Sequence, residues 1–408
     1  MRRAGSCGPV AKKLLVGIIC LGLCTPGARA LDWNIRSSLS ESLEFNDNRR
    51  MAVNPPGNSY NSVSSLMFDA KALTPTSVAG LVGNLRYLTF AGPGEANSRN
   101  TLDKNVTAAF TKRAKLTTYN FMTSWSQADA ATIQLDETGV ATVGGSVTTT
   151  TFGGGLRHEL GPRDTISWQT TYVSTEFTSA GSTPIASLTS TVDWNHKLSP
   201  ITVLTPSLQF QRLNYDNAAQ TEVTFWKATM GMNTELTKRL SFQAAAGGTL
   251  LNGEQNNVGG SANPALPTSG SVTGWLANAQ LIYNPLATVR VVLTAAHTTA
   301  PNTFGQINTS DTVGVYVSYD INTVSSLSLS GSVSQQSSAV ERVSAQAGSS
   351  ANESLSAVIA YSRQLAREWR TNLSYRYAQQ RGNSNINNSD ARSNSVVFNI
   401  SRDVTILP

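Results

Sequence analysis

Beyond residue 30 this chain has no cysteine, since its three cysteines are Cys7, Cys20 and Cys24. That absence excludes a disulfide framework and a thiolate metal site in residues 31–408. The stability of this part of the chain must therefore come from hydrogen bonding and packing.

Charge is also scarce, because only 14% of the residues are charged while 40% are hydrophobic. Five of the 31 basic residues, but none of the 25 acidic residues, lie within residues 1–30, which leaves a net charge of +1 from residue 31 onward. Since no basic stripe is left to neutralise phosphates, we expect no nucleic-acid partner. The 7 Trp, 11 Tyr and 12 Phe argue against a disordered chain.

Long hydrophobic runs are missing too, since no apolar stretch of about 18 residues follows Ala30, and the sequence predicts no membrane-spanning helix. Residues 1–30 have the features of a secretory signal, namely Arg2, Arg3, Lys12 and Lys13, the apolar segment 14–24 and the tripeptide Ala28-Arg29-Ala30. We expect a signal peptide over residues 1–30 that is cleaved before Leu31.

What the chain does have is apolar residues at every second position. In the first segment these are Leu31, Trp33, Ile35, Leu39, Leu43 and Phe45, with polar residues between them, and similar segments recur to the end of the chain. Alternation predicts strands with one apolar face, in a soluble sandwich as well as in a membrane barrel. Many aromatic residues lie at segment ends, which favours a barrel with rings at both membrane interfaces: Trp33, Phe45, Tyr87, Trp125, Trp168, Trp194, Tyr283 and Trp369.

The connections alternate between tight turns and long polar loops. Tight turns are expected near residues 73–76, 112–115, 160–163, 198–200, 236–239, 284–286, 320–323 and 365–368, and long loops near 47–58, 92–100, 127–145, 176–184, 214–220, 252–271, 299–310, 335–352 and 379–392. Nine loops and eight turns predict an all-β, antiparallel up-and-down barrel of 18 strands, with 16 as the alternative count. It would form a single domain over residues 31–408, with both termini in the periplasm. The pattern is weakest around 109–117 and 147–158, and the loop 335–352 is expected either outside the barrel or folded inward as a constriction.

Signals for catalysis and cofactors are weak. The three histidines, His158, His196 and His297, show no metal-ligand spacing along the chain, and each is better explained as a hydrogen-bonded or solvated side chain. Gly153-Gly154-Gly155 lacks the Lys-Ser/Thr of a phosphate loop and is better explained as a bent strand. We expect no enzyme activity, no cofactor and no bound metal.

Charged residues recur on the polar face of strands near both chain ends. The candidates for lining a pore are Arg36, Glu44, Asp69, Lys71, Arg86, Arg370 and Arg376. Opposed charges in a lumen would orient polar solutes. Alternatively, they pair with one another and only stabilise a polar interior.

Segments 39–48 (LSESLEFNDN) and 135–139 (LDETG), with turns such as Lys197-Leu198-Ser199-Pro200, resemble those of a known family. That family comprises proteobacterial outer-membrane β-barrel proteins associated with exopolysaccharide or exosortase (PEP-CTERM) systems. The resemblance runs over the whole chain after residue 30, rests on short motifs and implies no particular functional residue.

These observations predict an outer-membrane barrel of a Gram-negative cell. It would be a porin-like channel for polar solutes or a component of exopolysaccharide export, because barrels of 16 to 18 strands leave an aqueous lumen. The alternative is a closed structural or adhesion barrel whose extracellular loops bind partners. Expected partners are outer-membrane lipid and lipopolysaccharide, the barrel-assembly machinery, and polysaccharide or small polar solutes.

Overall fold

The computed structural model describes residues 32–49, 51–92, 99–130, 132–133, 145–178, 183–216, 222–254, 269–301, 307–338, 351–384 and 387–407. The strands are β1 (Asp32–Asn46), β2 (Ser59–Leu73), β3 (Ser77–Ala91), β4 (Arg99–Arg113), β5 (Thr117–Asp129), β6 (Ser146–Glu159), β7 (Asp164–Phe177), β8 (Ile185–Ser199), β9 (Thr202–Tyr215), β10 (Glu222–Thr237), β11 (Leu240–Glu254), β12 (Ser269–Leu286), β13 (Val289–Pro301), β14 (Ile307–Asn322), β15 (Ser325–Ser338), β16 (Ala351–Gln364), β17 (Trp369–Ser384) and β18 (Asn387–Leu407). The signal peptide expected over residues 1–30 lies outside the described residues.

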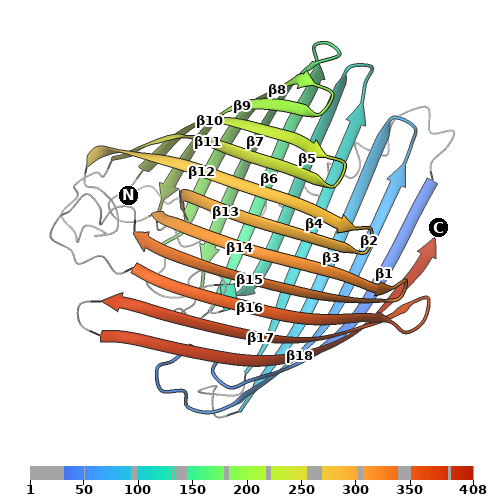
Figure 1. Ribbon diagram of the computed structural model, residues 1–408, viewed down its shortest axis with the longest axis vertical. Helices are drawn as coiled ribbons and strands as arrows, with labels where there is room; N and C mark the ends of the chain where they lie inside the picture. The colour runs from blue at the N-terminus through green and yellow to red at the C-terminus, as the bar shows by residue number, and fades with distance from the viewer. Residues whose placement is uncertain are drawn as a thin grey trace, which may run out of the picture.

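The 18 strands form one closed sheet. Each strand pairs antiparallel with its neighbours in the chain, and β1 pairs with both β2 and β18, which closes the wall (Figure 1). The predicted up-and-down barrel of 18 strands is confirmed, and the alternative count of 16 is wrong. Among the described residues, no helix is long and apolar enough to cross a bilayer.

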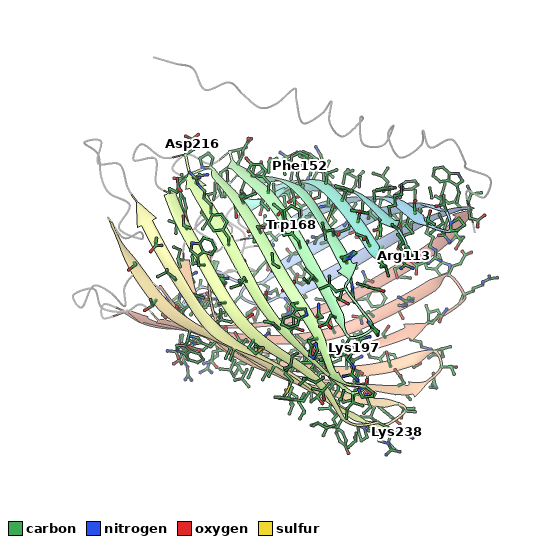
Figure 2. All side chains as sticks on the ribbon, turned by 90° about the horizontal axis from the view of Figure 1, so that it is seen from above. Arg113, Phe152, Trp168, Lys197, Asp216 and Lys238 are labelled. Carbon is green, nitrogen blue, oxygen red and sulfur yellow. The ribbon has the colours of Figure 1, made fainter. Side chains whose placement is uncertain are left out.

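Short connections alternate with the other connections along the chain. The connection between β17 and β18 is also short, but it belongs to the other end of the barrel. We call the end that holds the eight connections predicted as tight turns the turn end, and the opposite end the loop end. In the first short turn the Ser77 N–H donates to the Thr74 Oγ1 at 2.8 Å, and the Thr74 N–H donates to the Ser77 carbonyl at 2.8 Å. Figure 2 shows Arg113, Lys197 and Lys238 toward the turn end and Asp216 at the opposite end.

Some strands run further than the alternation predicts. β17 and β18 stay paired up to Ser384 and Asn387, well inside the loop expected over 379–392, and β13 and β14 extend into the loop expected over 299–310. A backbone ladder needs no apolar side chains, so strands continue past the point where the apolar pattern ends. The weak segments at 109–117 and 147–158 contribute to β4, β5 and β6.

The two faces of the wall differ in character. The register of the 18 strand pairs places all seven tryptophans on one face, and that face also carries large exposed side chains such as Leu39, Leu208 and Val313. We call it the outer face and the opposite, mainly polar face the lumen face. The outer face suits the hydrocarbon of a bilayer.

The strands are tilted relative to the barrel axis. A row of directly opposed outer-face residues begins at Trp33, near the turn end of β1, and reaches Trp226, near the loop end of β10. Moving along such a row from β1 to β10 therefore climbs from the turn end to the loop end. This stagger is the shear that closure of a barrel requires.

A buried apolar cluster lies at the loop end. It contains Ile185, Leu213, Tyr215, Val223, Phe225, Leu251 and Ile307. The register places Leu213, Val223, Phe225 and Leu251 on the face opposite to the outer-face Phe210, Trp226 and Leu250. The cluster therefore lies inside the barrel.

Candidate lumen site

All seven candidate pore residues lie on the lumen face. They come from β17, β1, β2 and β3, which with β18 form one continuous arc across the seam where the chain ends meet. The polar positions of the alternating pattern place them there, because successive side chains of a strand point to opposite faces. Their part in conduction stays a prediction.

Lys71 and Asp69 form an ion pair on β2, with 2.9 Å between Lys71 Nζ and Asp69 Oδ2. They are two residues apart on one strand and so share a face. Arg36 on β1 stands directly opposite Asp69. This part of the arc therefore combines two cations with one carboxylate, close to the turn end.

Arg86 on β3 faces Asp103 on β4, with 4.0 Å between Arg86 Nη1 and Asp103 Oδ2. The Asp103 side chain is only 11% exposed, and its Oδ1 accepts a hydrogen bond from the Asp129 N–H at 3.1 Å. Asp103 was not among the residues predicted to line the pore. Its position in β4 could have identified it, because it belongs to the polar set of residues that alternates with the apolar Val106 and Phe110.

Glu44 is held by two amides. Asn61 Nδ2 donates to Glu44 Oε2 at 3.1 Å, and Asn46 Nδ2 donates to Glu44 Oε1 at 3.3 Å. Asn61 stands directly opposite Glu44 on β2. The carboxylate is therefore fixed in orientation near the loop end, and no cation among the described residues lies within ion-pair distance of it.

Three of the candidate arginines have no carboxylate within ion-pair distance among the described residues. These are Arg36, Arg370 and Arg376. Arg370 stands opposite Ser401 and Gln364, and Arg376 opposite Ser395 and Val358. The structure therefore pairs part of the predicted charge set and leaves three guanidinium groups available to a solute.

The loop end of the lumen is less polar than the alternating pattern predicts. Phe225 and Val223 are 0% exposed, and on β3 the inward Leu88 and Phe90 are also buried, with the Arg49 guanidinium 3.9 Å from the centre of the Phe90 ring. The alternation is interrupted where two successive residues are apolar, as at Phe225-Trp226 and Leu250-Leu251. Such pairs in the sequence could have predicted apolar side chains on the lumen face. Apolar side chains thus occupy part of the lumen at the loop end.

The three histidines lie on the outer face, and each has a side-chain partner on a neighbouring strand. Thr117 Oγ1 is 2.8 Å from His158 Nδ1, and Asp164 Oδ1 is 2.7 Å from His196 Nδ1. His297 is hydrogen-bonded to Asp311 and stacks on Trp275 at 3.7 Å between ring centres. Hydrogen-bonded histidines were predicted, but the Asp partners of His196 and His297 were not. Spacing along one strand cannot show a partner on the next.

These pairs do not form part of a metal site. No group of three or more His, Cys, Asp or Glu side chains suited to a metal ion is found in the described part of the chain. Trp194 Nε1 also donates to Asp164 Oδ1 at 2.9 Å, so this carboxylate already serves two donors. These contacts suit aromatic rings that are hydrogen-bonded at a membrane interface.

Comparisons with known proteins found matches to solved structures but not to sequences. No family model matches it, and no curated protein sequence does. The copper transporter OprC is similar with a TM-score of 0.54 and 12% identity, over 87% of this chain and 62% of that chain. A BenF-like porin from Pseudomonas fluorescens Pf-5 is similar with a TM-score of 0.52 and 13% identity, over 92% and 99% of the two chains.

Pseudomonas aeruginosa OccK2 is similar with a TM-score of 0.51 and 10% identity, over 92% of this chain and 98% of that chain. A second structure of OccK2, in complex with glucuronate, gives a TM-score of 0.50 and 11% identity. Identities this low establish the fold alone. The chain is a bacterial outer-membrane β-barrel with the fold of these porins.

Proposed function

We propose that this chain forms a channel for polar solutes across the outer membrane. The observation that carries the proposal is the arc of ionisable side chains on the lumen face of a closed 18-stranded barrel. Barrels of 16 to 18 strands leave an aqueous lumen unless a segment fills it. With short turns in the periplasm, as in outer-membrane barrels generally, both chain termini would be periplasmic.

The preferred solutes would be anionic. Arg36, Arg370 and Arg376 offer guanidinium groups that no described carboxylate neutralises, and guanidinium binds carboxylates through paired hydrogen bonds. OccK2 has been solved with glucuronate, a sugar acid. The sequence resemblance to barrels of exopolysaccharide systems leads to the finer proposal that acidic saccharides are carried.

Single-channel conductance of the refolded chain in a planar bilayer tests this proposal. We expect discrete steps, a reversal potential in a salt gradient that favours anions, and block by glucuronate but not by glucose. The double variant R370Q/R376Q is expected to lose most of the anion preference and the block. The matched control R402Q, on the outer face of β18, is expected to retain both. Equal selectivity in all three proteins would contradict a role for the arc.

A second candidate is a closed barrel whose loops bind partners outside the cell. The apolar cluster around Phe225 and Ile307 favours it, because it occupies lumen space at the loop end. A folded barrel that gives no conductance steps in the same bilayer would favour this closed barrel over the channel.

A further inference from the structure

The outer face of β1 carries a carboxylate within the apolar belt. Glu41 lies between Leu39 and Leu43 on this face, and those leucines are 60% and 53% exposed. Trp33 lies further toward the turn end and Phe45 further toward the loop end of the same strand. Ionisable side chains facing hydrocarbon are rare and destabilising, and they usually mark a functional contact.

Two serines hold this carboxylate against the wall. Ser62 Oγ donates to Glu41 Oε1 and Ser64 Oγ donates to Glu41 Oε2, each at 2.5 Å. Both serines lie on the outer face of β2. Neither carries a charge, and no cation pairs with Glu41 among the residues that the structure describes. Within the described part of the chain, this carboxylate therefore has hydrogen bonds but no ion-pair partner.

A cation lies on the same wall three strands away. Lys104 on β4 stands opposite Leu85, and Leu102 is the next outer-face residue of the strand, both leucines being 47% exposed. Within the described ranges, no carboxylate lies at ion-pair distance from Lys104. The two unpaired charges of opposite sign thus flank β2 and β3.

Glu41 and Lys104 lie at nearly the same depth. The row that starts at Glu41 runs through Ser64 and Tyr87 to Leu102, and Lys104 is two residues from Leu102 toward the turn end. With strands about 4.8 Å apart and tilted about 40°, the row climbs about 9 Å, and the two-residue step descends about 5 Å. The difference in depth is therefore only about 4 Å.

We propose that the outer wall of β1–β4 is an interface with a second copy of this chain. A two-fold axis along the membrane normal, near Leu66 and Leu85, would place β1 of one copy against β4 of the other. It would leave the depth of each residue in the membrane unchanged. Each interface then contains two ion pairs, Glu41 of one copy with Lys104 of the other. Both charges become paired in a low-dielectric region where their attraction is strong.

Charge complementarity at matched depth favours a second copy over lipid. Acyl chains offer no cation to Glu41 and no anion to Lys104. The exposed Leu66, Leu85 and Tyr87 between the charges supply apolar contact at the axis.

Charge exchange tests the interface directly. The full chain is extracted from the outer membrane in mild detergent, and its mass is measured by light scattering. E41K and K104E are each expected to raise the dimer dissociation constant at least tenfold, because each creates two like-charge contacts. The double variant E41K/K104E is expected to restore the dimer. K112E, which alters an outer-face lysine at the turn end of β4, is the matched control and should dimerise like the parent.

Cross-linking in the intact membrane gives a second readout, because residues 31–408 contain no cysteine. L66C should form a disulfide-linked dimer on oxidation, and L208C on β9 should not. A folded parent that is monomeric and does not cross-link through L66C would overturn the proposal, leaving lipid as the cover of Glu41. An oligomer insensitive to the charge exchange, or an L66C adduct with another protein, would overturn it as well.

Discussion

Charged side chains on the lumen face illustrate what local sequence can and cannot predict. Alternation placed Arg86 on the polar face, because the side-chain direction depends only on position along the strand. Its carboxylate partner Asp103 lies on β4 and is set by the register Arg86↔Asp103. Pairing between strands is a tertiary property, so the ion pair was not predicted.

Asp103 gives a test of this site. D103A is expected to lower the free energy of unfolding by about 1–3 kcal/mol, because the Asp129 N–H loses its acceptor and Arg86 its carboxylate. D103N keeps an acceptor oxygen and should lose less. Urea unfolding in detergent micelles measures both variants. Equal losses would show that the hydrogen bond to Asp129 contributes little.

Individual strands depend on glycine where backbones approach closely. A Cβ at Gly247 of β11 would lie 1.9 Å from the Ala228 carbonyl oxygen and 2.8 Å from the Thr229 Cα, both on β10. At the neighbouring Gly248 the nearest atom is the Gly274 carbonyl oxygen, at 3.8 Å. Two adjacent glycines in one strand therefore have opposite tolerance for a side chain.

This difference predicts the behaviour of two single substitutions. G247A should destabilise the barrel by about 1–3 kcal/mol, because the β10 backbone must move to accept the methyl group. G248A should be nearly neutral. The fraction of heat-modifiable barrel after refolding, together with urea unfolding, measures the effect. A G247A barrel as stable as G248A would contradict the close approach.

Closure brings together residues that the chain separates widely. β1 pairs with β18, so Phe45 stands opposite Val396, and Asn394 donates through Nδ2 to Asp47 at 2.7 Å. At the loop end, Ile307 of β14 belongs to the same buried cluster as Phe225 of β10. The lumen face is therefore polar along most of the arc and carries apolar side chains at its loop end, on β3 as well as around Phe225.

Phe225 provides the test of that apolar region. F225A should cost about 3–5 kcal/mol of stability, because a fully buried ring is lost. It should also raise single-channel conductance, because space opens at the loop end of the lumen. F210A removes an outer-face ring that lies 4.8 Å from Trp226 and should leave conductance unchanged. Unchanged conductance in F225A would place the narrowest passage elsewhere.

Period-two alternation and turn composition were enough to predict the strands, their number and the two faces of the wall. Both are local properties, since covalent geometry sends successive side chains to opposite faces and short turns force neighbouring strands to pair. Register, tilt and closure were decided only in the tertiary structure. They place Asp103 beside Arg86, Asp311 beside His297 and Lys104 level with Glu41, because these relations join residues whose separation along the chain carries no information about their distance in space.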